Sequence, residues 1–183
     1  MSYIQDLRAK IGHMRVLLPG CIVFIRNADG QILMQQRTYP RGKWGLPGGL
    51  MELEESPEDT VRREIKEETG MALGRLELFG AYSGADYLCV AQNGDEFQVV
   101  TLVYVCDDFA GAPTVMDDES LAFKWFATDE LPSDIARTHQ KIIADYIQYG
   151  MTWITSAPWH SVNRMPRAEI GAEHSITLRK ELT

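Results

Sequence analysis

Apolar residues recur at helical spacing near the start of the chain and then give way to the apolar runs that are typical of strands. Residues 2–14 place three apolar side chains on one side of a helix, which predicts a short helix lying against a larger body. These side chains are Ile4, Leu7 and Ile11. Two β-rich runs, 21–26 and 31–37, follow and are joined by the turn-forming residues 27–30. We predict that they form antiparallel strands of a hairpin.

The clearest helix signal covers residues 57–69. It follows a segment, 38–49, that contains two prolines and four glycines and is therefore predicted to be a loop. Ser56 is a suitable N-cap, Pro57 fits the first helical position, and Gly70 can adopt the left-handed conformation that ends a helix.

The second half of the chain carries several strand patterns and one further helix. Residues 134–149 have apolar side chains at helical spacing behind Ser133 as an expected N-cap. A turn is predicted at residues 93–95. The expected strands are 73–82, 86–91, 96–106 and 121–127.

This order of elements predicts an α/β (α+β) fold in which a mixed β-sheet is sandwiched between helices. We divide the chain into an N-terminal helical extension (1–16), a main domain (17–149) and a C-terminal tail (150–183). The tail is too weakly patterned to build a core alone, so we expect it to dock on its own domain or on a second subunit. Its residues Trp153 and Trp159 favour a homodimer, because exposed aromatic side chains are often buried at interfaces.

The composition of the chain limits the partners and the cellular compartment that we expect for it. The 183 residues carry a net charge of -8, which disfavours polymeric nucleic acid and anionic membranes. The N-terminus lacks the apolar region of a secretory signal, and no run is long enough to span a membrane. The three cysteines are widely spaced and suit free thiols in a reducing compartment. We therefore expect a cytoplasmic protein.

Three glutamates, Glu64, Glu67 and Glu68, share one face of the predicted helix. Neighbouring arginines and a lysine could neutralise them as a solvated acidic face. The opposite side of the helix is apolar and must be buried, however, so the carboxylates converge at the edge of the preceding loop. Hard oxygen ligands of this kind suit Mg²⁺ or Mn²⁺. We add Gly48 to the expected metal site, because its backbone can come close to another element.

The same segment resembles the Nudix box without a gap. The matching residues are Gly49, Glu55, Arg63, Glu64, Ile65, Glu67, Glu68, Gly70 and Met71. The resemblance extends in outline over residues 17–149 and implies the Nudix fold. It also implies metal-dependent hydrolysis of a nucleoside diphosphate linked to another moiety, such as an NDP-sugar, ADP-ribose or a modified nucleoside triphosphate. The expected partner is thus a small nucleotide.

The resemblance further implies individual roles. Glu64, Glu67 and Glu68 match metal-ligand positions, whereas Gly49, Glu55, Arg63 and Gly70 match positions that support the loop and helix. Glu119, six residues before Trp125, matches the placement of a further catalytic acid. Arg37 matches an arginine that contacts substrate phosphate. Tyr39 and Trp44 are candidates for stacking on a base, and Tyr87 resembles a tyrosine of dinucleoside polyphosphate hydrolases.

Several alternatives stay open on sequence grounds. The general base is Glu64, Glu68 or Glu119. A ligand sensor without catalysis, a dinucleoside polyphosphate hydrolase, an RNA-end decapping enzyme and an isomerase on the same fold are rival functions, and the uninterrupted box favours hydrolysis over the isomerase. The acidic charge disfavours the decapping enzyme, which needs a basic groove, and the intact box disfavours the sensor.

Overall fold

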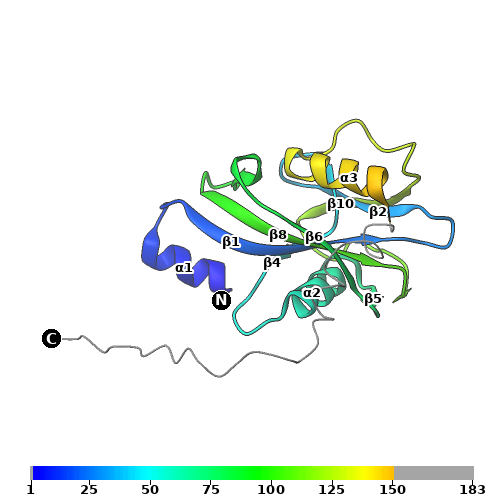
Figure 1. Ribbon diagram of the computed structural model, residues 1–183. Coiled ribbons are helices and arrows are strands. Elements are labelled where there is room, and N and C mark those ends of the chain that lie inside the picture. The colour runs from blue at the N-terminus through cyan, green and yellow to red at the C-terminus, as the bar shows by residue number, and fades with distance from the viewer. Residues whose placement is uncertain (1, 151–183) are drawn as a thin grey trace, which may run out of the picture.

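The computed structural model describes residues 2–150 and is built around a mixed five-stranded sheet (Figure 1). Its strands are β4 (Gly48–Leu50), β1 (Val16–Ile25), β8 (Glu96–Cys106), β6 (Glu77–Tyr82) and β7 (Leu88–Val90). β1 and β8 are parallel over their whole paired length, and the other pairs are antiparallel. The mixed sheet is thereby confirmed. The predicted tail, with Trp153 and Trp159, lies outside the described residues.

Two smaller sheets complete the strand structure of the described part. One is antiparallel and has the order β10 (Ser120–Phe126), β2 (Ile32–Arg37), β3 (Trp44–Gly45). The other pairs β5 (Ala72–Leu73) with β9 (Phe109–Ala110). The segment 38–49, predicted as a loop without regular structure, thus contains the short strand β3 and the start of β4.

The predicted hairpin of β1 and β2 is wrong. The turn between them forms, with Gly30 donating a backbone hydrogen bond to Asn27, but the two strands belong to different sheets. Among the described residues, a single bridge between Arg26 and Ile32 joins them. The reason is long-range: β8 and β4 already occupy the two edges of β1.

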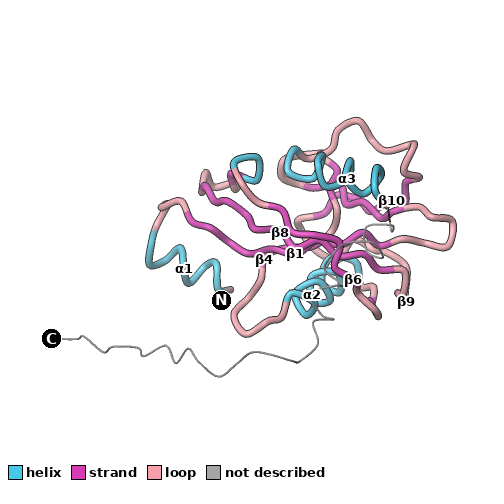
Figure 2. Tube along the Cα trace, viewed as in Figure 1, coloured by secondary structure: helices cyan, strands magenta, loops and turns pink. Residues whose placement is uncertain are grey.

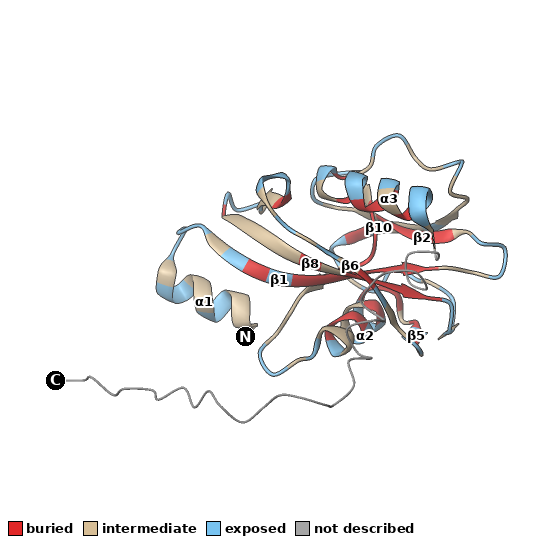
Figure 3. Ribbon diagram, viewed as in Figure 1, coloured by how far each residue is buried: buried red, intermediate tan, exposed pale blue. Residues whose placement is uncertain are grey.

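Helices α2 (Pro57–Thr69) and α3 (Arg137–Tyr149) cover opposite faces of the main sheet (Figures 1 and 2). The alternation of side chains along β1 explains this arrangement, because Ile22 and Phe24 pack with α3 whereas Cys21, Val23 and Ile25 pack with α2. Figure 3 shows buried residues on the sheet-facing sides of α2 and α3. One apolar layer therefore holds α2 against the sheet, and a second layer on the opposite face holds α3.

The limits of α2 are those predicted, with Ser56 accepting a hydrogen bond from Asp59 N–H and Gly70 in the left-handed conformation. The prediction for α3 was partly wrong. α3 begins at Arg137 behind Ala136, which has no side chain to cap it, rather than behind Ser133. Ile135 instead bridges to Trp44, and Ala136 N–H donates to Trp44 O at 2.7 Å. No helix within residues 2–150 combines the length and apolar character needed to cross a membrane.

The predicted N-terminal helix is present as α1 (Tyr3–Ile11), and a one-turn 3₁₀ helix, η1 (Ala85–Tyr87), precedes β7. Ser2 and Gln5 form a capping box at the start of α1. Tyr3 N–H donates to Glu52 Oε2 at 2.6 Å, and Arg8 Nε lies 3.2 Å from Asp95 Oδ2. These contacts attach α1 to the loop before α2 and to the turn before β8.

Candidate functional site

The two glycines before α2 allow an unusually close approach of backbone. β4 pairs with β1 so that Gly48 lies opposite Ile22 and Gly49 opposite Cys21. Gly48 has a φ of +131°, and a Cβ there would come within 2.8 Å of Ile22 Cα and still closer to the Cys21 carbonyl oxygen. Only glycine fits this position, because both the backbone angle and the space exclude a side chain.

Glu55 and Arg63 connect the loop to α2. Arg63 donates from Nε to Glu55 Oε1 at 2.5 Å and from Nη2 to Glu55 Oε2 at 3.0 Å, a fork-to-fork arrangement. Thr60 Oγ1 and Glu52 N–H also donate to this carboxylate. The Arg63 guanidinium, aided by these donors, holds the pKa of Glu55 at about 2. Glu55 is therefore ionised at neutral pH and ties the loop to the helix.

Glu64 and Glu67 lie on either side of the same guanidinium. Arg63 Nη1 donates to Glu64 Oε1 at 2.8 Å and to Glu67 Oε2 at 3.1 Å. The side chain of Glu64 is 17% exposed and that of Glu67 is 59% exposed. Burial raises the pKa of Glu64, with the charges of Glu67 and Glu119 adding to the effect and Arg63 opposing it. The attraction of one guanidinium thus does not offset the effect of burial on the pKa of Glu64.

Glu68 is the most deeply buried acid of the cluster, with 4% of its surface exposed. Gln35 Nε2 donates to Glu68 Oε1 at 2.8 Å, and Gly48 N–H donates to Oε2 at 3.1 Å. Burial, followed by the charge of Glu64, raises the pKa of Glu68 to about 8, while Arg37 acts in the opposite direction. A buried carboxyl this close to another acid is in an environment that favours a cation.

The loop between β9 and β10 brings further acids to the cluster. It is attached to the end of α2, since Met116 N–H donates to Glu68 O at 3.1 Å. Asp117 Oδ1 accepts from the backbone N–H groups of Glu119 and Ser120, and its charge raises the pKa of Glu68. Glu119 is exposed, and its backbone carbonyl accepts from Thr38. Glu119 therefore lies at the rim of the carboxylate group, near enough for its charge to affect Glu64.

The chemistry of these donors fits a hard divalent cation, although the side chains are not yet arranged around one point. Within residues 2–150, no three acidic, histidine or cysteine side chains form a ready metal-ligand group. Glu67 is turned toward Arg63, but its exposure leaves it room to change rotamer. Glu64 and Glu68 are carboxyls with a raised pKa, and such groups gain most from a bound cation.

The expected substrate-contacting residues do not all lie together. Arg37, at the end of β2, is close enough to Glu68 to lower the pKa of that carboxyl. Tyr39 is 41% exposed and could stack on a base. Trp44 instead packs edge-on against Phe126, with ring centroids 5.0 Å apart. Tyr87 is 5% exposed and belongs to the core layer under α3, and its hydroxyl is also buried, without a hydrogen-bond partner among residues 2–150.

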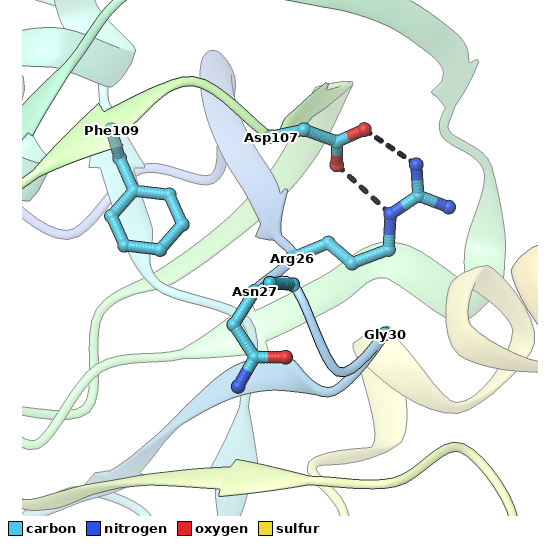
Figure 4. Close-up of a pocket in the computed structure, with 6 residues that line it drawn as sticks. Arg26, Asn27, Gly30, Asp107 and Phe109 are labelled. Atoms are coloured by element: carbon cyan, nitrogen blue, oxygen red, sulfur yellow. Dashed lines mark hydrogen bonds and ion pairs between the residues drawn. The ribbon is translucent and has the colours of Figure 1, made fainter.

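The hollow at the turn between β1 and β2 is a different feature (Figure 4). It measures about 510 Å³ and is lined by residues of that turn with Asp107 and Phe109, and by none of the clustered acids. Arg26, which points into it, is bound in a fork-to-fork pair with Asp107, Nε to Oδ1 at 2.9 Å. Because this guanidinium is already paired, the hollow offers a phosphate little, and we place the candidate site at the carboxylates instead.

Three residues at the cluster were not singled out from the sequence: Gln35, Asp117 and Ser120. Gln35 is fully buried and contacts both Glu68 and Ser120 Oγ. The position of Gln35 in the sequence could have identified it. It lies at a buried position of β2, where an apolar residue is expected. Asp117 is an acid two residues before Glu119 and offered no signal beyond that spacing.

Comparison with known proteins identifies the family to which this arrangement corresponds. The family model described as NUDIX domain matches residues 16–146. An ADP-ribose pyrophosphatase of Methanocaldococcus jannaschii is 34% identical over 75% of this chain and 75% of that protein. A MutT-like protein of Streptomyces ambofaciens is also 34% identical, over 76% of this chain and 80% of its own length.

A solved structure supports the same assignment. The MutT NUDIX hydrolase of Burkholderia pseudomallei is 36% identical, with a TM-score of 0.60, and the match covers 70% of this chain and 96% of that chain. α1 precedes the matched segment 16–146 and is thus an addition to the part of the chain that the family model describes.

Proposed function

We propose the reaction of this chain from one premise: it belongs to the Nudix family of pyrophosphohydrolases. The reaction is hydrolysis of a phosphoanhydride bond in a small nucleotide, a nucleoside diphosphate linked to a second moiety, with Mg²⁺ or Mn²⁺ as cofactor. The observation that carries the proposal is the pair of desolvated carboxyls, Glu64 and Glu68, on one face of α2 beside the closely packed glycines Gly48 and Gly49 of β4. A pyrophosphate can approach such an acidic surface only when cations lie between them.

Glu64, Glu67 and Glu68 would hold the divalent cation, with the backbone of Gly48 beside them. The cation supplies charge neutralisation for the phosphate oxygens and a more acidic water. Glu55 and Arg63 keep the loop and α2 together, and Arg63 restrains Glu64 and Glu67 through one shared nitrogen. The chain thus supplies oxygen ligands on a rigid helix rather than on a mobile loop.

Glu119 is the acid best placed to take a proton from the attacking water. Glu64 is paired with Arg63, and Glu68 accepts from Gln35 and Gly48. The carboxylate of Glu119 is exposed and has no side-chain partner among residues 2–150. A base must have an oxygen free to accept a proton, so Glu119 fits this role better than the other two.

The substrate side of the site is proposed to use Arg37 for a phosphate group and Tyr39 for the base. The hydroxyl of Tyr87 is proposed as a further contact that becomes exposed when substrate binds, because it is buried in the free protein. Tyr87 is the least accessible of the candidates, and the ring of Trp44, which is half-buried, packs on Phe126. ADP-ribose is the first substrate to try, since a relative of 34% identity is named an ADP-ribose pyrophosphatase. The net charge of -8 argues against a polymeric nucleic acid.

The test is metal-dependent turnover of a substrate panel by the full-length protein. We would measure phosphate release, coupled to a phosphatase, from ADP-ribose, NDP-sugars, nucleoside triphosphates and dinucleoside polyphosphates, each with Mg²⁺, Mn²⁺ or chelator. We expect turnover of one class that chelator abolishes and that Glu68→Gln lowers about 100-fold. Glu130→Gln, an exposed acid in the loop before α3, is the matched control and should retain wild-type turnover.

Two results would contradict the proposal. Turnover that persists in chelator would exclude the metal role, and wild-type turnover in Glu68→Gln would exclude this carboxylate cluster. Tight binding of a panel compound without any hydrolysis would instead identify a sensor on the same fold.

A cytoplasmic location and a homodimer remain proposals. The dimer argument rests on the aromatic residues of the tail, and its test is the mass of the full chain in solution compared with that of a chain ending at Gly150. Equal assembly states would remove the tail from the interface.

A further inference from the structure

Gln35 is a polar side chain where the fold calls for an apolar one. It lies on β2 with no exposed surface, in the row of inward-facing side chains that also contains Leu33. A primary amide buried without partners is costly, so its neighbours must account for its presence.

Both hydrogens of the amide are used. Gln35 Nε2 donates to Glu68 Oε1 at 2.8 Å and to Ser120 Oγ at 2.8 Å. The amide oxygen faces Arg37, whose Nη1 lies 3.5 Å from Gln35 Oε1. Gln35 is therefore placed between the buried acid of α2, the start of β10 and the arginine proposed to contact phosphate.

The second oxygen of Glu68 is held independently, by Gly48 N–H at 3.1 Å. The carboxylate thus accepts one bond from β2 and one from β4, which fixes both its position and the orientation of its plane. A carboxylate fixed by two donors on separate strands is prepared to bind an ion without first becoming ordered.

We propose that Gln35 is a positioning residue of the metal site, which orients Glu68 for the cation and links it to Arg37. This inference rests on the proposed function of the same cluster. Glutamine suits the role because it is a neutral donor at this length. A glutamate would place a second negative charge against Glu68, and methionine would fill the space but leave Glu68 Oε1 without its donor.

The experiment measures metal binding directly, without substrate. The dissociation constant of Mn²⁺ is determined by electron paramagnetic resonance of free Mn²⁺ for the wild type, Gln35→Met and Ser120→Ala. Ser120→Ala is the matched control, because it removes the other acceptor of the same amide and leaves the bond to Glu68 intact. Urea unfolding of each variant verifies that the proteins are folded when their Mn²⁺ dissociation constants are compared.

We expect Gln35→Met to weaken Mn²⁺ binding about 10- to 100-fold, the usual effect of losing a residue that orients a metal ligand. The Mg²⁺ concentration for half-maximal turnover should rise by the same factor, and kcat at saturating Mg²⁺ should largely recover. Ser120→Ala should bind Mn²⁺ as the wild type does. If Gln35→Met does not fold, Gln35→Asn retains the amide but withdraws it from Glu68, and the same loss is expected.

The outcomes separate the two proposals. A folded Gln35→Met or Gln35→Asn protein whose Mn²⁺ dissociation constant stays within about twofold of a metal-binding wild type would overturn the role of Gln35. Equal losses in Ser120→Ala and Gln35→Met would overturn it as well, since general loosening would then explain both. A wild type that binds no Mn²⁺ would reject the proposed metal site itself.

Discussion

The carboxyl group of Glu64 occupies the space that a side chain on Gly49 would need. A Cβ built on Gly49 would lie 2.5 Å from Glu64 Oε1 and 2.6 Å from Oε2, well inside van der Waals contact. The absence of a side chain at this position is what allows the glutamate to lie against β4. Gly48 is also indispensable, but its restriction comes from the backbone of β1.

We therefore expect Gly49→Ala to remove activity while the protein stays folded. The alanine methyl group meets only the end of a flexible side chain, which can rotate away. Displacement of a ligand by about 1 Å can lower turnover about 100-fold. The measurements are metal-dependent turnover and the urea midpoint. Wild-type turnover in Gly49→Ala would show that the position of Glu64 is not needed.

Gly48→Ala, unlike Gly49→Ala, should mainly lower the stability of the protein. Its methyl group meets the backbone of Cys21 and Ile22, and its φ of +131° is strained for any residue with a side chain. We expect a loss of about 3 kcal/mol or more in the free energy of unfolding. Thermal unfolding of the two alanine variants side by side tests the contrast, and a Gly48→Ala protein as stable as Gly49→Ala would contradict it.

Local signals in the sequence predicted α2 to the residue because all of them lie inside the segment itself. Ser56, Pro57 and Gly70 act on backbone groups within one turn, and no distant partner changes their effect. The same holds for the turn at residues 93–95, where Gly94 N–H donates to Ala91 O.

The errors arise where distant segments compete for the same backbone. The turn after β1 looked like a hairpin, yet β8, some 80 residues later, pairs with β1 along Val16–Ile25. Ser133 looked like a cap, yet Ile135 pairs with Trp44 and moves the start of α3. Glu64, Glu67 and Glu68 could be named as candidates from the sequence, whereas Gln35 could not, because its role depends on a contact between residues 33 positions apart.

Glu54 provides a test of backbone strain at a residue that has no proposed role in metal binding, catalysis or substrate contact. It is the one non-glycine residue among the described residues with a positive φ, +67°, and it is exposed. Glycine adopts this conformation without steric cost, so Glu54→Gly should raise the free energy of unfolding by about 0.5–1 kcal/mol. Glu54→Ala removes the same charge but retains a Cβ, and it should give no comparable gain. Equal urea midpoints for Glu54→Gly and the wild type would contradict the strain.

His139 gives the protein a defined acid sensitivity. Its ring is buried, and Nδ1 accepts from Leu46 N–H at 2.9 Å, which requires an unprotonated nitrogen. Burial, together with the charge of Arg37, lowers the pKa of His139 to about 3 from its ordinary value of 6.5. A depressed pKa contributes stability that is fully present above the unfolded-state value and is lost as the pH falls toward the folded-state value.

The variant His139→Asn retains an acceptor for Leu46 N–H and lacks the titration. We expect the stability of the wild type relative to this variant to fall by about 2–3 kcal/mol between pH 7 and 4.5. The wild type is compared with this variant at each pH because Glu68 has the opposite effect on stability. The pKa of Glu68 is raised, so this group increases the free energy of unfolding as the pH falls. Urea unfolding at several pH values measures the difference, and a difference independent of pH would show that His139 is not neutral in the folded state.

Tyr87 and Tyr82 form a natural pair for testing a substrate contact. The hydroxyl of Tyr87 is the one buried side-chain polar atom of residues 2–150 without a hydrogen-bond partner, whereas that of Tyr82 interacts with Asp145, whose carboxylate adds to burial in raising the pKa of Tyr82. Removing an unpartnered hydroxyl should not destabilise the protein, so Tyr87→Phe should equal the wild type in stability or exceed it by about 1 kcal/mol. Tyr82→Phe should lose about 1 kcal/mol.

Kinetics then show whether a ligand supplies the missing partner. If the Tyr87 hydroxyl bonds to substrate, Tyr87→Phe should raise KM about fivefold to tenfold with little change in kcat, which corresponds to one neutral hydrogen bond. This combination, unchanged or greater stability together with a higher KM, is the result expected if substrate binding exposes the buried hydroxyl. An unchanged KM for the substrate that the panel identifies would assign Tyr87 to the core alone, and a loss of stability would mean that its hydroxyl has a partner in the free protein.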